Sequence, residues 1–143
     1  MTTSSNIRRL CLALTLALGT VPARAMADGC AVDAEGLSRA LDAQSRDYAI
    51  ASDIDCTAPQ LPAHRLICAS AADNGLLWQM AQLDDGAYVY AFENATGRET
   101  LHDDPPRDAA FIALRDACTD EVCLCAAYIT HTGASLGGLS PYQ

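Results

Sequence analysis

Apolar residues recur at helical spacing along most of the chain, and this pattern predicts a small all-α domain of about four to five helices. The first amphipathic stretch runs from Ala34 to Ser52, and Asp33 precedes it as an N-cap. After a loop that contains two prolines, Ala63 to Ser70 predicts a second, short helix. We see no internal repeat and no linker, so the pattern indicates one domain.

A longer apolar pattern in the middle of the chain predicts a third helix. It begins after Asn74, which suits an N-cap, and continues from Leu76 to Tyr88. Trp78 lies among the leucines of this stretch, which favours packing in the core over an exposed role. Two features weaken the second half: Gly86 costs helix stability, and the run from Tyr88 to Tyr90 alone would also suit a strand.

The C-terminal part of the chain predicts an exposed loop and two more helices. The loop is the polar, turn-rich stretch from Asn94 to Pro106. The next helix covers Asp108 to Cys118, and Thr119 is expected to cap a last helix that extends to His131. The glycine-containing tail from Gly133 onward is expected to fray.

The first 27 residues predict a secretory signal peptide of bacterial type. Their apolar stretch, residues 10–19, is too short to span a bilayer, and small residues in a cleavage pattern follow it. We expect the mature chain to begin at Asp28, with Met26 as the alternative, so that residues 28–143 form the domain. The expected location is the periplasm or the outside of the cell, with no stable membrane insertion once the signal is removed, and disulfide bonds form in both compartments.

Six cysteines lie beyond the predicted signal peptide, and two close pairs stand out among them. Cys118 and Cys123 would be about 7.5 Å apart along an unbroken helix, and a disulfide needs Cα atoms within about 6.8 Å. A bond between them therefore requires a helix break. Six cysteines allow fifteen connectivities. The preferred pairing, whose third bond follows by elimination, is Cys56–Cys68, Cys118–Cys123 and Cys30–Cys125.

The charge of the mature chain is strongly acidic. All nine basic residues are arginines, and three of them leave with the signal peptide, so six arginines face eighteen acids for a formal charge of −12. Such a charge disfavours binding to nucleic acid or to an anionic membrane, and it attracts basic partners. Solubility alone is the competing explanation.

The sequence carries no pattern that indicates catalysis. The three histidines are scattered, and no nucleophile elbow, phosphate-binding loop or zinc-protease motif is present. Cys118, Cys123, Cys125 and His131 do not match a common zinc spacing, and an oxidising compartment favours disulfides. We therefore expect no enzyme activity, no metal and no cofactor.

Two blocks of the sequence resemble a known family. The first is Asp55-Cys56-Thr57-Ala58 followed by His64-Arg65-Leu66-Ile67-Cys68. The second is Phe111-Ile112-Ala113-Leu114-Arg115-Asp116-Ala117-Cys118, followed by Cys123-Leu124 and Tyr128. Together they look like the LprI-type lysozyme inhibitor domain, which closes with an Arg-Asp-x-Cys block, a second cysteine and a tyrosine.

The resemblance covers Asp55 to about Thr132 and departs from the family pattern at several positions. His64 stands where the family has glutamate, Phe111 replaces the usual tryptophan, and Leu76-Leu77 replaces a Leu-Asp pair. The resemblance implies a secreted or envelope-attached helical domain with disulfides. Lysozyme inhibition is implied only as an activity of some members, because fold transfers more safely than function.

These observations lead to two hypotheses about function. The first is a secreted or periplasmic inhibitor that binds and occludes a basic lysozyme-type cell-wall hydrolase. The alternative is a structural or stress-related envelope domain with no enzyme target. For the inhibitor, the candidate partner-binding residues lie in the predicted loop and in a second acidic patch. They are Glu99, His102, Asp103 and Asp104 in the loop, and Asp84 and Asp85 in the patch.

Overall fold

The prediction of a small, disulfide-stapled all-α domain is confirmed by a computed structural model, which describes residues 30–44, 53–100 and 104–142. Within these ranges the regular structure consists of five helices. They are α1 (Ala34–Gln44), α2 (Pro62–Ala71), α3 (Leu76–Thr96), α4 (Ala109–Asp116) and α5 (Glu121–Ser135). None of the helices within the described ranges has both the length and the apolar character that a membrane span requires.

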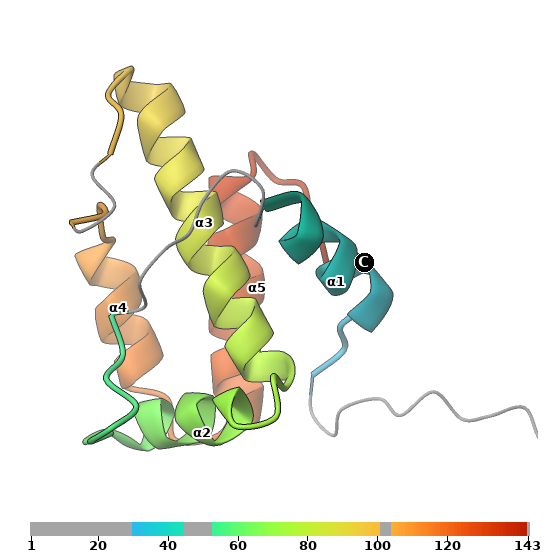
Figure 1. The fold of residues 1–143 in the computed structure, drawn as a ribbon, viewed down its shortest axis with the longest axis vertical. Helices are drawn as coiled ribbons and strands as arrows, with labels where there is room; N and C mark the ends of the chain where they lie inside the picture. Colours follow the sequence, from blue (N-terminus) through green and yellow to red (C-terminus); the bar gives the residue numbers. More distant parts are fainter. Residues whose placement is uncertain (1–29, 45–52, 101–103, 143) are drawn as a thin grey trace, which may run out of the picture.

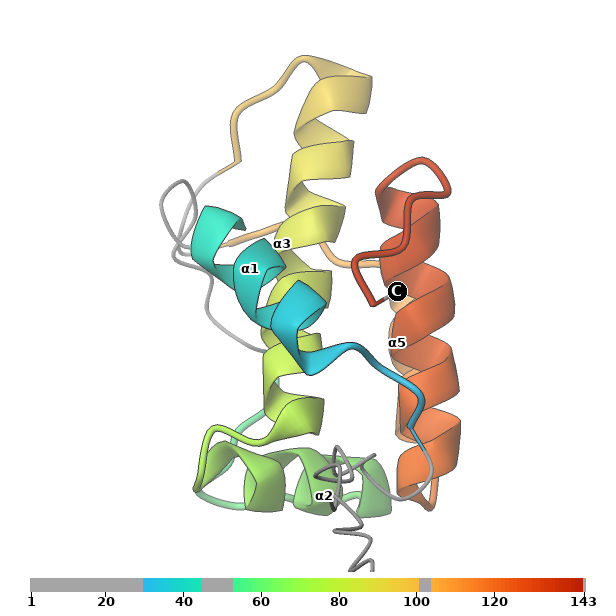
Figure 2. The same cartoon turned by 90° about the vertical axis from the view of Figure 1, so that its right-hand side faces the viewer.

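The long helices α3 and α5 lie side by side and form the centre of the fold (Figure 1). α1 packs across α3, α4 lies against α5, and α2 crosses the base of the bundle beneath α3 (Figure 2). The core between them is mostly apolar, with Asp84, Arg115 and Thr132 as its buried polar residues. Its largest fully buried apolar side chains include Leu37, Ile67, Met80, Leu124 and Tyr128. Trp78 is partly buried and packs against this core, as expected from its apolar neighbours.

Aspartate side chains start two of the helices. Asp108 accepts hydrogen bonds from the backbone N–H groups of Ala110 (2.8 Å) and Phe111 (3.1 Å), and Asp120 accepts one from Cys123 (2.9 Å). These carboxylates satisfy N–H groups that have no partner within the helix. The last helix is thus capped by Asp120 and not by Thr119.

The third helix differs from the sequence prediction at both ends. Its N-cap is Gly75, because Asn74 has a left-handed backbone (φ 54°) that belongs to the turn after α2. At the other end, α3 continues through Tyr88–Tyr90 to Thr96 and stops at Gly97 (φ 67°), whose N–H donates to the carbonyl of Glu93. The strand alternative is therefore wrong, because Tyr88–Tyr90 continue α3 and Val89 is its last buried residue.

Gly86 has a packing role within α3. A Cβ atom at this position would overlap the side chain of Gln44, which reaches over from the end of α1 and donates to the carbonyl of Gln82 (2.9 Å). The glycine thus leaves room for the Gln44 side chain, which links the end of α1 to α3. The end of the first predicted helix, residues 45–52, lies outside the described residues.

The three disulfide bonds join the pairs expected from the sequence. Cys118 and Cys123 bridge the corner between α4 and α5 with a Cα–Cα distance of 5.5 Å, which the helix break at this corner makes reachable. A second bond holds the loop before α2 against that helix, and a third ties the start of the described chain to α5. These are Cys56–Cys68 and Cys30–Cys125.

The expectation of a frayed C-terminal tail is wrong. α5 continues to Ser135, and Tyr142 is only 2% exposed. The carbonyl of Tyr142 accepts a hydrogen bond from the N–H of Asp33 (3.0 Å), and its hydroxyl lies 2.8 Å from the hydroxyl of Thr132. The glycines at 137 and 138 form the turn that brings the tail back onto α1 and α5.

Candidate partner-binding site

The C-terminal end of α3 and the turn after it, residues 90–100, project from the domain, and we call this segment the projecting end. Val89 is the last buried residue of α3, and the seven residues from Tyr90 to Thr96 extend about 10 Å further. Tyr90 is 52% exposed, although it is a large aromatic residue. Figures 1 and 2 both show this end of α3 standing clear of the other helices.

Side-chain hydrogen bonds fix the turn at the end of this segment. The backbone N–H and the hydroxyl of Thr100 both donate to one carboxylate oxygen of Glu93, at 2.8 and 2.7 Å. The N–H of Arg98 donates to the hydroxyl of Thr96 (3.3 Å), which itself donates to the carbonyl of Phe92 (2.7 Å). The turn is thus a defined structure on a rigid helix, which lowers the entropy lost when it binds a partner.

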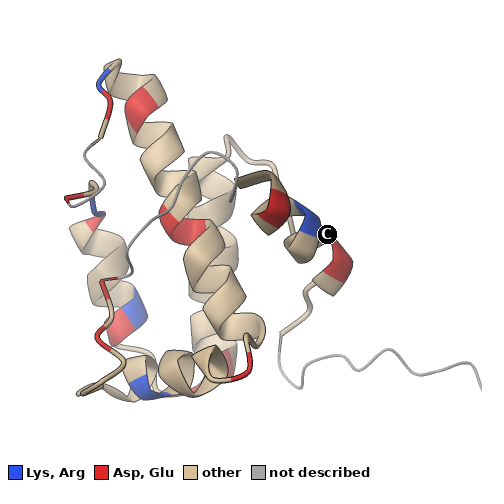
Figure 3. Cartoon of the chain, in the orientation of Figure 1, with Lys and Arg blue, Asp and Glu red and all other residues tan. Residues whose placement is uncertain are grey.

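Two of the predicted loop residues are placed at the surface. Glu99 is exposed within the projecting end, and Asp104 is exposed further along the connection to α4. His102 and Asp103 lie outside the described residues. Figure 3 shows that acidic positions also occur on α1 and in the segment before α2, so the acidic surface is not confined to the projecting end.

The predicted second patch at Asp84 and Asp85 is corrected by the structure, because Asp84 is only 1% exposed. Asp84 lies on the face of α3 that packs against α5, where it accepts a hydrogen bond from the Thr132 hydroxyl (2.6 Å). The ring Nδ1 of His131 lies 2.9 Å from both of its carboxylate oxygens. A buried carboxylate with these partners has no surface for a binding protein.

Asp85 also lies inside the fold's polar contacts, where it faces Arg107 in the segment that leads from the predicted loop to α4. The Arg107 guanidinium is 3.9 Å from Asp85 and 3.7 Å from Asp53. Burial, reinforced by the negative charge of Asp53, raises the pKa of Asp85 to about 7 against the opposing charge of Arg107. Asp85 therefore helps to hold the segment before α4 against α3.

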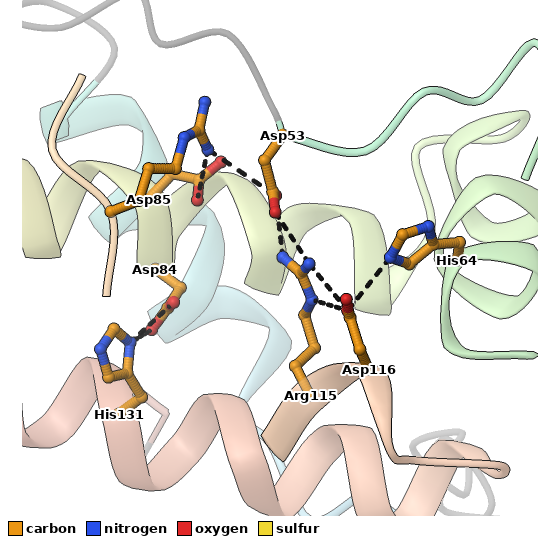
Figure 4. A network of polar contacts seen from close by, with 8 residues as sticks. Asp53, His64, Asp84, Asp85, Arg115, Asp116 and His131 are labelled. Carbon is orange, nitrogen blue, oxygen red and sulfur yellow. Dashed lines mark hydrogen bonds and ion pairs between the residues drawn. The ribbon is translucent and has the colours of Figure 1, made fainter. Parts of the chain in front are cut away.

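Arg115 is the centre of this network and is only 3% exposed (Figure 4). Its guanidinium donates two bonds of 2.8 Å to the two carboxylate oxygens of Asp53. Its Nε donates one bond to Asp116 (2.9 Å), and its Nη2 lies 2.8 Å from the same oxygen as an ion pair. Asp116 is in turn 3.0 Å from the ring Nε2 of His64. Burial opposes the charge on Asp53, but the hydrogen bonds and charge of Arg115 lower the pKa of that carboxyl.

His131 joins three helices in a second group of polar contacts beside the Arg115 network (Figure 4). Its ring stacks on Phe111 with centroids 3.8 Å apart and planes within 4°, and its Nε2 lies 3.5 Å from the N-cap carboxylate Asp108. Burial disfavours a charge on His131, but the hydrogen bond and charge of Asp84, together with Asp108, raise its pKa above 6.5. The contacts of His131 therefore hold the start of α4 against α3 and α5.

Sequence reasoning missed the network as a unit. The available signal was Arg115 itself, an arginine in the apolar run of Phe111, Ile112 and Leu114, since a buried arginine needs carboxylate partners. The cavity lined by the network measures about 20 Å³, which is room for a water molecule and far below the size of a substrate pocket. We interpret the network as structural: it holds the segment between the predicted loop and α4 against the rest of the fold.

The raised pKa of Asp85 predicts a pH-dependent stability. Asp85 is protonated in the folded protein up to about pH 7, whereas the same carboxyl in the unfolded chain ionises near pH 3.8. The contribution of Asp85 to stability is therefore fully present below pH 3.8 and is lost as the pH rises through 7. Asp85→Asn should thus be more stable than the parent by roughly 1 to 3 kcal/mol at pH 8, and equally stable near pH 4. Urea unfolding at both pH values measures this difference.

The matched control for that experiment is Asp104→Asn, which removes a carboxylate from an exposed position. Because it empties no buried position, it should not reproduce the gain in stability at pH 8. The raised pKa of His131 also lowers stability as the pH rises above 6.5, but it does so in both proteins and cancels in the comparison. A difference between Asp85→Asn and the parent that stays constant from pH 4 to 8 would contradict the burial of this carboxyl.

The geometry thus separates an internal network, which supports the fold, from the projecting end, which offers exposed aromatic and charged groups. The latter is the better candidate for contact with a partner. No protein-family model, no curated protein and no solved structure matches this chain. The resemblance to the LprI-type domain therefore stays a prediction.

Proposed function

We propose that the protein is a secreted or periplasmic inhibitor of a basic lysozyme-type cell-wall hydrolase, and that it acts by binding and occluding the catalytic cleft. The observation that carries this proposal is the projecting end. Two helical turns beyond Val89 have no buried residue, yet they include Tyr90 and Phe92 and finish in a fixed turn with Glu99 exposed. A convex, rigid segment of this kind suits insertion into a concave site.

The charge of the protein supports a basic target. The full chain has a formal charge of −9, and the predicted signal peptide contributes only positive charge to it. Opposite net charges accelerate the encounter of two proteins and favour one orientation over others. A typical animal lysozyme is basic, and its cleft acts through two carboxylates. An inhibitor needs only to fill such a cleft, and a protein without catalytic groups can do so.

The first test measures lysis of bacterial cell walls by a basic lysozyme in the presence of the oxidised protein that begins at Asp28. We expect dose-dependent inhibition that is lost after reduction and alkylation, because the projecting end depends on the stapled fold. No inhibition by a folded protein at large molar excess would reject the proposal for this class of hydrolase. The alternative of a structural envelope domain without an enzyme target would then lead.

A charge reversal at the projecting end tests the surface involved. Glu99→Lys should weaken inhibition about tenfold, because it places a positive charge where a basic partner approaches. Asp73→Lys is the matched control: it makes the same change in net charge at an exposed turn between α2 and α3, at the other end of α3. We expect it to alter inhibition by less than about twofold. Equal losses in both variants would mean that only the overall charge matters.

A further inference from the structure

Arg98 differs from the other arginines that the structure describes. Four of them are held by the protein's own acceptors: Arg39 by Asp33 and Glu35, Arg65 by the carbonyl of Gln60, Arg107 by Asp53 and Asp85, and Arg115 by Asp53 and Asp116. The guanidinium of Arg98 has no hydrogen bond or ion pair within the described ranges. In a chain with twice as many acids as bases, this cation is left available.

Arg98 also has a well-defined position at the end of α3. It follows Gly97, the left-handed residue that ends α3, and it is exposed at the outermost turn of the projecting end. Its backbone N–H is held by the hydroxyl of Thr96, and Thr100 is tied back to Glu93. The backbone is therefore fixed on both sides of a side chain that extends from the protein.

We propose that Arg98 enters the catalytic cleft of the inhibited hydrolase and pairs with a catalytic carboxylate. This inference rests on the proposed function and names the contact that would block the site. Retaining glycoside hydrolases hold two carboxyl groups about 5 Å apart in a concave cleft. The planar fork of an arginine matches a carboxylate with two hydrogen bonds, and its charge is permanent.

The charges around Arg98 fit this arrangement. The surface of a basic hydrolase attracts the acidic protein as a whole, but its cleft is locally negative because of the catalytic carboxylates. At the outermost turn, Arg98 would face the negative carboxylates at the bottom of the cleft. The exposed carboxylate of Glu99, which follows it, would face the basic surface around the cleft. An entirely acidic tip would be repelled by the same floor.

A double-mutant cycle tests the pairing. The two binding proteins are the parent and Arg98→Gln, and the two partners are a basic lysozyme and the same enzyme with its catalytic carboxylates changed to amides. Calorimetry measures the four affinities, so that the inactive enzyme can be included. We expect Arg98→Gln to bind the intact lysozyme about tenfold more weakly than the parent does, and the two proteins to bind the amide enzyme equally.

Arg98→Lys provides the conservative comparison and should lose about threefold, because it keeps the charge without the fork. Equal affinity of the parent and Arg98→Gln for intact lysozyme would overturn the inference while leaving the proposed inhibition in place. So would an equal loss against both forms of the enzyme, since the contact would then lie away from the carboxylates. Failure of the parent to bind lysozyme at all would reject the proposed function together with this inference.

Discussion

Replacing Arg115 by methionine is expected to lower the free energy of unfolding by about 3 to 5 kcal/mol, the largest effect of any single substitution that the network predicts. The guanidinium is 3% exposed and neutralises Asp53 and Asp116, two half-buried carboxylates. Without it, Asp53 would keep only the longer contact to Arg107 (3.7 Å), and Asp116 would keep the contact to His64 (3.0 Å). Asp53 would also lose the bidentate contact that fixes the segment before α2 against α4.

Chemical denaturation of the oxidised protein measures this effect, and Arg65→Met is the matched control. Arg65 is exposed and donates to the carbonyl of Gln60, so its replacement should change stability by less than about 0.5 kcal/mol. Adding Asp53→Asn to Arg115→Met should recover part of the loss, because it removes one of the two carboxylates that lose their bond to Arg115. A loss below about 1 kcal/mol in Arg115→Met would show that the carboxylates are solvated without their partner.

The helices themselves were readable from the sequence because their apolar spacing reflects the core that they enclose. Leu37 in α1 and Leu124 in α5 are buried, as their positions in the periodic pattern predicted. Helix ends were less predictable, because several polar residues compete to cap them. Thr119 and Asp120 both suit an N-cap, and the choice of Asp120 depends on the path that the Cys118–Cys123 bond imposes on the corner.

Features that depend on contacts between distant segments could not be read from local patterns. Asp84 looks like a surface residue in sequence, and its burial depends on His131 and Thr132, which lie almost 50 positions away. The C-terminal tail shows the same limit, because its glycines suggested fraying while Tyr142 anchors it through Thr132. Buried polar groups are stable only with such partners, so their positions are a property of the whole fold.

The candidate binding segment was predicted in part. The exposed position of Glu99 followed from the polar, turn-rich composition of its surroundings. The projection of α3 did not, because the run of Tyr90, Ala91 and Phe92 has the composition of a buried helix. Only the packing of the other helices reveals that none of these residues is buried and that Tyr90 is exposed. The availability of Arg98 likewise emerged from the pairing of the other arginines.

Removal of the disulfide between Cys30 and Cys125 by alanine substitution is expected to cost up to about 4.7 kcal/mol, because the bond closes a loop with a sequence separation of 95. Both cysteines are buried, so the bond also anchors the start of the domain to α5. The matched control is the double alanine variant of Cys118 and Cys123, whose separation of 5 predicts about 2 kcal/mol by the same relation.

Thermal and urea unfolding of the two double variants under oxidising conditions compare these losses directly. We expect the Cys30 and Cys125 variant to unfold at the lower denaturant concentration, because chain entropy in the unfolded state rises with the length of the loop that is released. The reverse order would mean that local geometry at the α4–α5 corner matters more than loop closure.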